Sequence, residues 1–525
     1  MTRKVTRWLS SALGAVAGVA LLSAASQLTG CNFAAGVRSN PSAGAAGSSG
    51  SAGATGGDAA AGAAPWDAAS PFDFGGAYLN HDAGDATGSG PCENLGCQQS
   101  TCYGAGCTVT CPAGQRTTVS GTIYDPAGAV PLYNVTVYVP NAALADIDDG
   151  PSCDPCNPNT GTSLLSGKPI VFTKTDTSGR FTLGKTLGDV PAGENVPLVI
   201  QIGKWRRQVT LPSVKPCVDN PITDTSLSRL PRTSAEGHIP KIALTTGGSD
   251  AMECLLRKIG IADTEFTSDA GKGRVNLFAG GGGTSSFAPG AGDGVAFTPA
   301  NPWWDSLDNL KKYDIVLHSC EGSQGEYGTT NNPGDPMSVK SPAARMALQQ
   351  FADLGGRVFA SHWHTYWFEK GTPAFMSIGT FNHNPALGRS YDATIDQSFP
   401  TGSALAQWMV NVSGSTTLGM VTIAQDANAR LIDAAAGPPT SQRWIYASTL
   451  KPQSVQFLSA TTPIPAGTCG RAVISDLHVS AGGNGSDAPN KPFPSGCINP
   501  TMSPREKVLE FMLFDIASCV APVVQ

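Results

Sequence analysis

The hydrophobic residues of the chain follow two different patterns, and the change from one to the other marks a boundary between two predicted domains. From Thr117 to about Leu211, apolar and polar residues alternate with a period of two, as they do in strands that bury one face. Turn signals such as Asp-Pro-Ala-Gly at 125–128 separate the alternating segments. Short strands with turns at this spacing predict a β-sandwich over residues 117–230. The expected strands cover 118–124, 135–139, 180–183 and 196–202.

From residue 236 onward, continuous apolar runs of strand length alternate with helical patterns. Unbroken apolar strands separated by helices are typical of a parallel sheet that is covered on both faces. Asp250 is expected to cap the first helix, because a short acidic side chain is a preferred N-cap. We therefore expect an α/β domain over residues 236–525. Its expected strands cover 241–248, 275–279, 313–319, 357–362 and 471–478, and its expected helices 251–258, 303–312, 342–354 and 506–516.

The N-terminus has the pattern of an export signal. Three cations, Arg3, Lys4 and Arg7, precede an uncharged apolar stretch at 9–25, and small residues follow it. The sequence Leu-Thr-Gly-Cys then ends at Cys31 and resembles the lipobox of bacterial lipoproteins. The resemblance implies that residues 1–30 are removed and that Cys31 carries a lipid. The alternative is an ordinary signal peptide with a chance cysteine.

The mature chain is thus expected to be exported and lipid-anchored to the bacterial cell envelope, at the outer membrane or the cell surface. The lipid would be its membrane contact, because no second apolar run reaches the length that a bilayer requires. Residues 31–90 are rich in Gly, Ala and Ser and predict a disordered tether. The formal net charge of -6 gives no basic surface, so a nucleic-acid partner is not expected.

Most of the 14 cysteines are expected to form disulfides, because an exported chain meets an oxidising compartment. Residues 91–116 form a Cys-rich segment without histidine, which favours cross-linked loops over a zinc knuckle. We expect the insert cysteines Cys153 and Cys156 to pair, and likewise Cys469 and Cys497. Setting Cys31 aside leaves an odd number of cysteines, so at least one thiol is expected to be free or paired with another molecule. The three remaining cysteines of the α/β domain, of which one is left over, are Cys254, Cys320 and Cys519.

Residues 117–211 also carry a family pattern. Its members are Gly121, Asp125, Gly128, Pro131, Leu132, Val135 and Val137, then Thr175, Asp176, Gly179 and Phe181, then Val-Pro-Ala-Gly at 190–193. The pattern resembles the carboxypeptidase regulatory-like (transthyretin-like) domain. The resemblance implies a β-sandwich that accompanies other domains and is not itself catalytic. The chain departs from the family by a long insert between Asn141 and Pro169.

The second half resembles the glutamine-amidotransferase-like superfamily, and most closely its ThuA-like branch. The matching segments are 313–316, 355–362 and 470–478. The resemblance implies a flavodoxin-like parallel sheet with any site at the carboxyl ends of the strands. The family's nucleophile motif is Gly-x-Cys-x-Gly, and His318 stands where its first glycine belongs. The later His-x-Glu reads His478-Val-Ser here, so amidotransferase activity is not carried over.

Three expected strands end in polar pairs with a spacing of two residues, which project together from a strand. In a parallel sheet all three pairs would face one crevice. Most of these residue types bind metals or transfer protons. The pairs are His318 with Cys320, His362 with His364, and Asp476 with His478.

Three interpretations of these pairs remain open. In a cysteine hydrolase, Cys320 would be the nucleophile at a tight turn, with His318 or His478 as the neighbouring imidazole. In a metal site, an ion such as zinc would be held with an open position for hydrolysis, by His362, His364, His478 and either Asp476 or His318.

In the third interpretation the fold is reused for binding. The aromatic residues at 363 and 366–368 then form a packing cluster or a shallow rim for a glycan. We favour this interpretation, so the chain is expected to be a non-catalytic binding or structural protein of the envelope. Its partner would be a glycan or another envelope polymer. A metal- or Cys/His-dependent hydrolase is the alternative.

Overall fold

The computed structural model describes residues 91–521, apart from 103–105, 157–163, 186–187, 325–338, 385–389, 425–429, 450–452 and 479–485. The predicted export signal, Cys31 and the tether lie outside the described residues. None of the helices in the described part has both the length and the apolar character that a membrane crossing requires.

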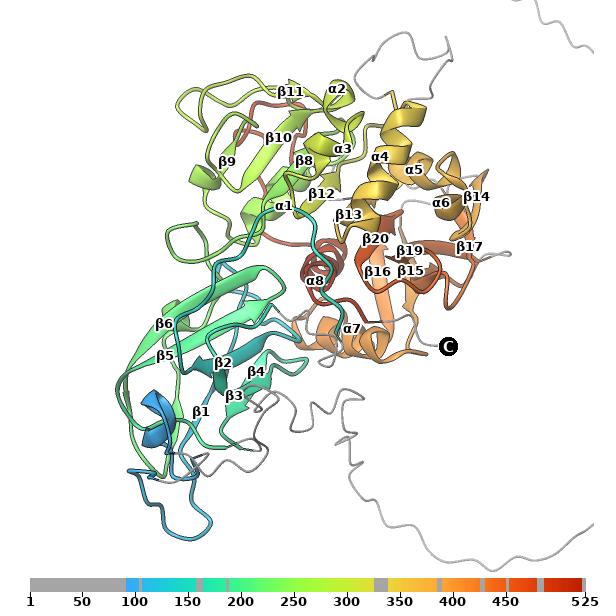
Figure 1. Cartoon of the computed structure of the whole chain (residues 1–525). Coiled ribbons are helices and arrows are strands. Elements are labelled where there is room, and N and C mark those ends of the chain that lie inside the picture. Colours follow the sequence, from blue (N-terminus) through green and yellow to red (C-terminus); the bar gives the residue numbers. More distant parts are fainter. Residues whose placement is uncertain are drawn as a thin grey trace, which may run out of the picture. The chain divides into compact units, whose positions relative to one another are not determined.

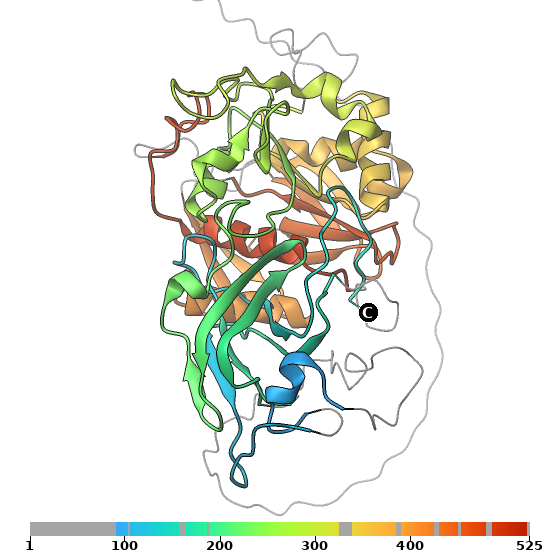
Figure 2. The ribbon, with the colours of Figure 1, turned by 60° about the vertical axis from the view of Figure 1, so that its left-hand side comes forward.

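Residues 117–221 form two small sheets. Their strands are β1 (Thr118–Thr122), β2 (Thr136–Pro140), β3 (Pro169–Lys174), β4 (Arg180–Leu183), β5 (Gly193–Ile202), β6 (Trp205–Val214) and β7 (Asp219–Pro221). One sheet has the order β4-β1-β7 and the other β3-β2-β5-β6, in which β5 and β6 form the longest pair (Figure 2). Val119 and Leu183 from the first sheet share one buried cluster with Val137 and Ile200 from the second.

The four strands expected in this region correspond to β1, β2, β4 and β5. Sequence reasoning missed β3, β6 and β7. β6 begins with Trp205, Arg206 and Arg207, and its two arginines hide the alternation of buried Val209 and Leu211 that follows them. β3 closes the insert, where the family resemblance stops.

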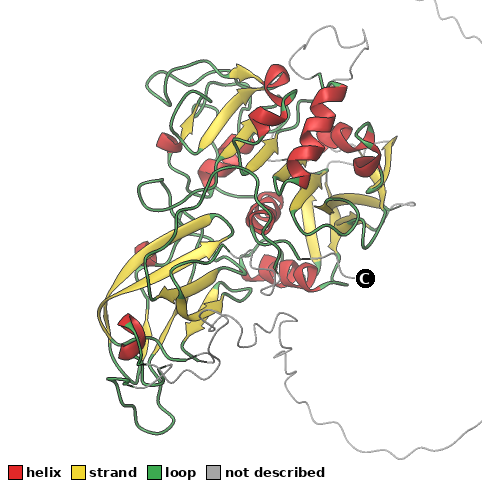
Figure 3. Ribbon diagram, viewed as in Figure 1, coloured by secondary structure: helices red, strands yellow, loops and turns green. Residues whose placement is uncertain are grey.

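The α/β part is built on one large sheet, shown in Figures 1 and 3. Its parallel strands are β8 (Ile242–Thr245), β10 (Val275–Ala279), β12 (Ile315–His318), β13 (Arg357–Ser361) and β20 (Gly470–Ser475), in the order β10-β8-β12-β13-β20. Two short strands lie beside β10: β9 (Phe266–Thr267) and β11 (Thr298–Pro299). The sheet continues past β20 through β19 (Ser454–Thr462), β18 (Gln442–Ala447), β15 (Ser390–Ile395) and β16 (Met420–Ala424). A separate hairpin joins β14 (Gly379–Asn384) to β17 (Arg430–Ala435).

This second half of the sheet corrects the expectation of a purely parallel sheet. Strand β19 runs antiparallel to β20, and β18 antiparallel to β19. Short loops join these strands in sequence order, and such loops permit only antiparallel neighbours, because a parallel pair needs a longer crossover. The whole sheet is therefore mixed.

The helices cover both faces of the sheet. They are α1 (Met252–Lys258), α2 (Ala300–Trp304), α3 (Leu307–Leu310), α4 (Pro342–Asp353), α5 (Tyr366–Glu369), α6 (Pro373–Met376), α7 (Pro400–Asn411) and α8 (Pro504–Ala517). The single helix expected at 303–312 is in fact two, α2 and α3. Asp250 does not cap α1, whose N-cap is Ala251 without a side-chain hydrogen bond.

Alternate residues of each strand enter different cores. In β12, Ile315 and Leu317 belong to the cluster with α1 and α8, whereas Val316 belongs to the cluster with α2, α4 and α5. This is the two-residue period of a strand buried on both faces. His318 follows Val316 and therefore projects toward α2 and α5.

Helix α8 packs on the small sheets as well as on the large one. Phe511 stacks on Tyr133 with ring centroids 6.0 Å apart, and Phe514 meets Trp205 edge-on at 5.6 Å. One buried cluster therefore runs from the small sheets through α8 to the large sheet. A capping box between Ser503 and Glu506 begins the helix.

The described residues form six disulfides. They are Cys92–Cys97, Cys102–Cys107, Cys111–Cys217, Cys153–Cys469, Cys156–Cys519 and Cys254–Cys497. The expected pairs of Cys153 with Cys156 and of Cys469 with Cys497 are wrong. The insert leaves its own sheets and lies against the α/β part, where the backbone of Pro155 pairs with Val520, so its cysteines reach distant partners. Among the described cysteines only Cys320 is free.

Two buried carboxyl groups meet where α8 contacts the small sheets. Asp125 lies in the turn after β1, and Glu510 lies on α8. Burial raises the pKa of Asp125 to about 6 and, together with the charge of Asp125, raises the pKa of Glu510 well above its usual range. The folded chain thus holds protons that the unfolded chain releases near pH 4.

The raised pKa values predict the direction in which stability depends on pH. The contribution of the protonated pair to the free energy of unfolding is complete below about pH 4 and is lost as pH rises through about 6 and above. We expect Glu510→Gln to increase the free energy of unfolding at pH 7.5 by on the order of 1–2 kcal/mol, because the amide stays neutral. The variant should also show a smaller fall of this free energy as pH rises above 4. Denaturant unfolding at several pH values measures this, with the exposed-site variant Glu194→Gln as the control. A Glu510→Gln curve parallel to that of the control would contradict the assignment.

Candidate functional site

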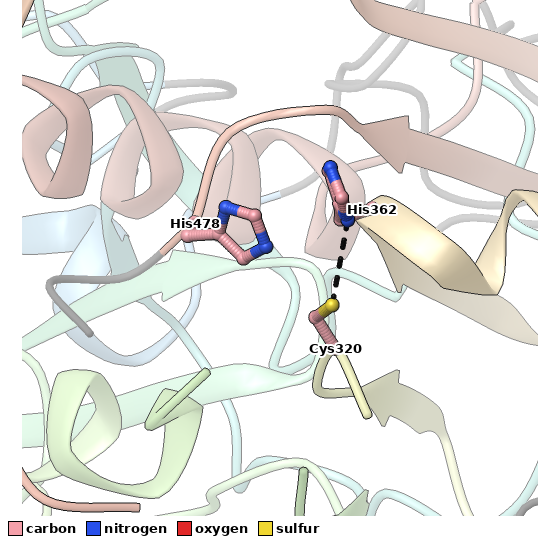
Figure 4. Close-up of side chains that lie close together, drawn as sticks. All are labelled: Cys320, His362 and His478. Carbon is pink, nitrogen blue, oxygen red and sulfur yellow. Dashed lines mark hydrogen bonds between the residues drawn. The ribbon is translucent and has the colours of Figure 1, made fainter. Parts of the chain in front are cut away.

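Three side chains from three neighbouring strand ends converge in the α/β part. Cys320 follows β12, His362 follows β13, and His478 follows β20 (Figure 4). One potential ligand atom from each lies within 4.8 Å of the other two, and the Cys320 Sγ is 3.5 Å from the His362 Nδ1. All three are buried, with exposures of 0%, 2% and 3%.

The loop that carries Cys320 is shaped by glycines. Gly322 has a φ of +80°, which turns the chain back so that its N–H lies 3.5 Å from the Cys320 Sγ. Gly247 permits a close approach of the loop after β8, because a Cβ there would lie 2.2 Å from the Cys320 carbonyl oxygen. β12 leads into a loop over residues 319–324 rather than directly into a helix, so Cys320 does not occupy a strand-turn-helix nucleophile elbow.

His362 stands in an unusual backbone conformation. Its φ of +46° lies in the left-handed region, which costs a non-glycine residue about 1–3 kcal/mol. The turn ends β13 and begins a 3-10 helix (His362–Thr365), so it redirects the imidazole toward Cys320 and His478. Burial and the neighbouring His478 hold the pKa of His362 well below its usual value. The imidazole is therefore neutral near pH 7.

Asp476 lies behind His362 rather than among the converging donors. Its Oδ1 is 3.8 Å from the His362 Nε2, on the opposite side of the ring from Cys320. Its Oδ2 accepts a hydrogen bond from the backbone N–H of Leu431. At 3.8 Å the Oδ1 lies beyond hydrogen-bond distance of the ring.

His318 and His364 belong to an inner layer, which corrects their expected place in the site. His318 stacks between His364, at 4.9 Å, and Trp367, at 5.2 Å. Burial lowers the pKa of His318 to about 3. The His364 Nδ1 accepts a hydrogen bond from the Trp367 Nε1, so its Nε2–H donates to the Ser319 carbonyl oxygen.

The two-residue spacing failed because the strands end within or before the pairs. β12 ends at His318, inside its pair, whereas β13 ends at Ser361 and β20 at Ser475, just before theirs. After those ends the backbone turns, and Cys320 and His362 leave the period of two. Each expected pair therefore divides, with one member in the converging cluster and the other outside it.

The aromatic residues near the site belong mainly to the core. Tyr366, Trp367 and Phe368 are at most 5% exposed, so they form a packing cluster and not a rim for a ligand. Trp363 is partly buried and meets His362 and His383 edge-on. Sequence reasoning missed Glu321 and Lys340, a buried ion pair beneath Cys320. No sequence signal marks Lys340, which follows a polar loop.

The donor set suits a thiophilic metal ion. Two ligands at ordinary Zn–S and Zn–N distances around a tetrahedral ion lie about 3.5 Å apart, which matches the Cys320–His362 separation. Neutral imidazole is the form that binds metals, and the pKa of His362 favours it. Three protein ligands leave a fourth position open.

Comparisons with known proteins give little more. No family model and no curated protein matches the sequence. A protein from Bacteroides uniformis ATCC 8492 described as ThuA-like shares 9% identity, with a TM-score of 0.26; the match covers 45% of this chain and 82% of that one. A cytoplasmic protein from Salmonella typhimurium shares 11% identity, with a TM-score of 0.25, over 45% of this chain and 87% of that one. At such TM-scores neither likeness carries an argument.

The cysteine assignment is testable in the full chain. We expect alkylation of the denatured, unreduced protein to label Cys320 and none of the other cysteines between residues 91 and 521. Labelling of the native protein should be at least about tenfold slower, because the thiol is buried. Mass mapping measures both, and the reduced, denatured protein is the control. A second labelled cysteine in that range would contradict the disulfide pattern.

Proposed function

We propose that the chain is a metal-dependent hydrolase of the bacterial cell envelope, with zinc held by Cys320, His362 and His478. The convergence of these three donors from three strand ends carries the proposal. A bound zinc ion would supply Lewis acidity and a water molecule of lowered pKa in its fourth position.

The side chains around the donors have separate roles in this proposal. Asp476, whose Oδ1 is 3.8 Å from the His362 Nε2, would orient the ring from behind by closing to hydrogen-bond distance, which leaves Nδ1 for the ion. The N–H of Gly322 stabilises the Cys320 thiolate. Ser361, at the end of β13, donates its hydroxyl hydrogen to the buried Asp250 carboxylate, which anchors the backbone immediately before His362.

Metal binding accounts for the geometry better than a cysteine nucleophile. A Cys–His nucleophile pair uses one imidazole at the sulfur. The second histidine at the same sulfur has no role in a Cys–His pair, whereas a metal requires it. We therefore favour a metal site over the non-catalytic binding function that the sequence indicated.

The proposal also includes the predicted folds of the two parts, export with lipidation, and the substrate class. The order β10-β8-β12-β13-β20 supports a flavodoxin-like core, since it reads 2-1-3-4-5 among the parallel strands. The shared core of the two small sheets supports a carboxypeptidase regulatory-like sandwich beside it. The lipobox supports export and lipidation at Cys31. We propose a glycan or another envelope polymer as substrate, with Trp363 as a partly buried aromatic contact.

Metal content tests the proposal directly. We expect the purified, full exported chain to hold about one zinc per molecule, as measured by elemental analysis, and the double variant His362→Ala/His478→Ala to hold none. The control His383→Ala replaces an exposed histidine and should keep the metal. The loaded and variant proteins are then compared on ester, amide and glycoside substrates. Absence of metal from all three proteins would overturn the proposal, and polymer-binding assays would then follow.

The role of Asp476 gives a second prediction. We expect Asp476→Asn to weaken zinc binding by about 10- to 100-fold, because the carboxylate no longer orients the His362 ring. Competition with a chromogenic chelator measures the Kd. The exposed-site variant Asp308→Asn should leave the Kd unchanged. An unchanged Kd in Asp476→Asn would show that the carboxylate does not act on the site.

A further inference from the structure

Beneath the proposed metal site lies a buried ion pair between Glu321 and Lys340. The Lys340 Nζ is 2.8 Å from the Glu321 Oε2, and both side chains are 0% exposed. Such pairs are rarely retained for stability alone, because removing two charges from water offsets most of their attraction. We infer that this pair is the positioning element that holds Cys320 in its site; its effect on metal binding rests on the proposed function.

Glu321 joins the Cys320 loop to the neighbouring loop after β10. Its Oε1 accepts a hydrogen bond of 3.0 Å from the Gly281 N–H, while its Oε2 binds Lys340. At Gly280 a Cβ would lie 3.1 Å from the same Oε1 and 2.0 Å from the Thr246 carbonyl oxygen, so these loops approach each other through glycine. The residue directly after Cys320 is thus held from two sides.

Lys340 is held within an aromatic enclosure. Its ammonium lies 5.4 Å from the centroid of Trp304 and 5.7 Å from that of Trp367, whose rings meet at 89°. It also donates a hydrogen bond to the Gln324 carbonyl oxygen at 3.1 Å. Lys340 therefore binds the loop at two points, Glu321 and Gln324, both on the C-terminal side of Cys320.

The N-terminal side of the loop has hydrogen bonds of its own. The His364 Nε2–H donates to the Ser319 carbonyl oxygen, and the Ser249 N–H donates to that of Cys320. The backbone of Cys320 is thus held on both sides, which places its side chain opposite His362. Release of the Lys340 contacts would free the C-terminal side, including the Gly322 turn that faces the sulfur.

The test uses a matched buried lysine elsewhere in the chain. Lys258 pairs with Asp487 and Glu506 at 2.7 and 2.6 Å, and its side chain is 5% exposed. Lys340→Met and Lys258→Met each remove a buried cation from carboxylate partners, but only the first touches the Cys320 loop. In the full chain we expect Lys340→Met to accelerate alkylation of native Cys320 at least tenfold and to weaken zinc binding at least tenfold. Lys258→Met should change neither, although it lowers the thermal stability.

A double variant separates positioning from stability. In Glu321→Gln/Lys340→Met no charge is left unpaired, so thermal stability should recover relative to Lys340→Met. Alkylation of native Cys320 should stay accelerated. In the cobalt-substituted variant, the thiolate-to-metal absorption band should be weaker than in the wild type. This variant carries the test if Lys340→Met does not fold.

The outcomes distinguish the two proposals. Wild-type protein without metal, but with Cys320 accelerated in the Lys340 variants, would overturn the proposed function and support the positioning role. If the wild-type protein holds metal and the Lys340 variants match it in Cys320 alkylation rate and in zinc affinity, the positioning role alone is overturned. Equal acceleration of Cys320 alkylation in Lys258→Met would also overturn it.

Discussion

The site depends on the register of three parallel strands. His318 pairs with Ala360, Ala360 pairs with Ile474, and Ser361 pairs with Ser475. Because parallel strands in this register end at one level, the residues just beyond their ends reach the same small volume. A shift of one residue in any strand would turn its side chains to the other face and disperse the donors. The register is itself determined by two cores, which take alternate residues of each strand.

The site has two layers with different electrostatic roles. The outer layer, Cys320, His362 and His478, offers one sulfur and two imidazoles to a cation. The inner layer contains the buried ion pair of Glu321 and Lys340, and two histidines whose pKa values are lowered by burial. A fixed positive charge on Lys340 also lowers the pKa of His318 and His364, which keeps both rings uncharged. Both nitrogens of His364 are also occupied by hydrogen bonds, with the Ser319 carbonyl oxygen and the Trp367 indole.

The sequence indicated the strands and the chemistry of their ends, because long apolar runs and rare residue types are local signals. All three converging donors were among the candidates. The grouping was wrong, since it extended the two-residue period past the ends of β12 and β13 to Cys320 and His364. The left-handed backbone of His362 and the partnership of Glu321 with Lys340 depend on tertiary contacts that no local pattern records. The antiparallel half of the sheet was also missed. β15 and β16 alternate buried with partly exposed residues, whereas β19 is buried over its whole length and was not recognised as a strand.

The disulfide pattern has a consequence for the way in which the chain is made. Cys153 and Cys156 lie 316 and 363 residues before their partners, although each has the other as a close neighbour. A chain synthesised from its N-terminus meets the wrong partner first and the right one last. Correct pairing must therefore wait until Cys519, near the C-terminus, has emerged, or an early bond between neighbours must be exchanged. These two disulfides therefore close only after most of the chain is present, and a cell that makes this protein needs either delayed oxidation or a means of exchanging an early wrong bond.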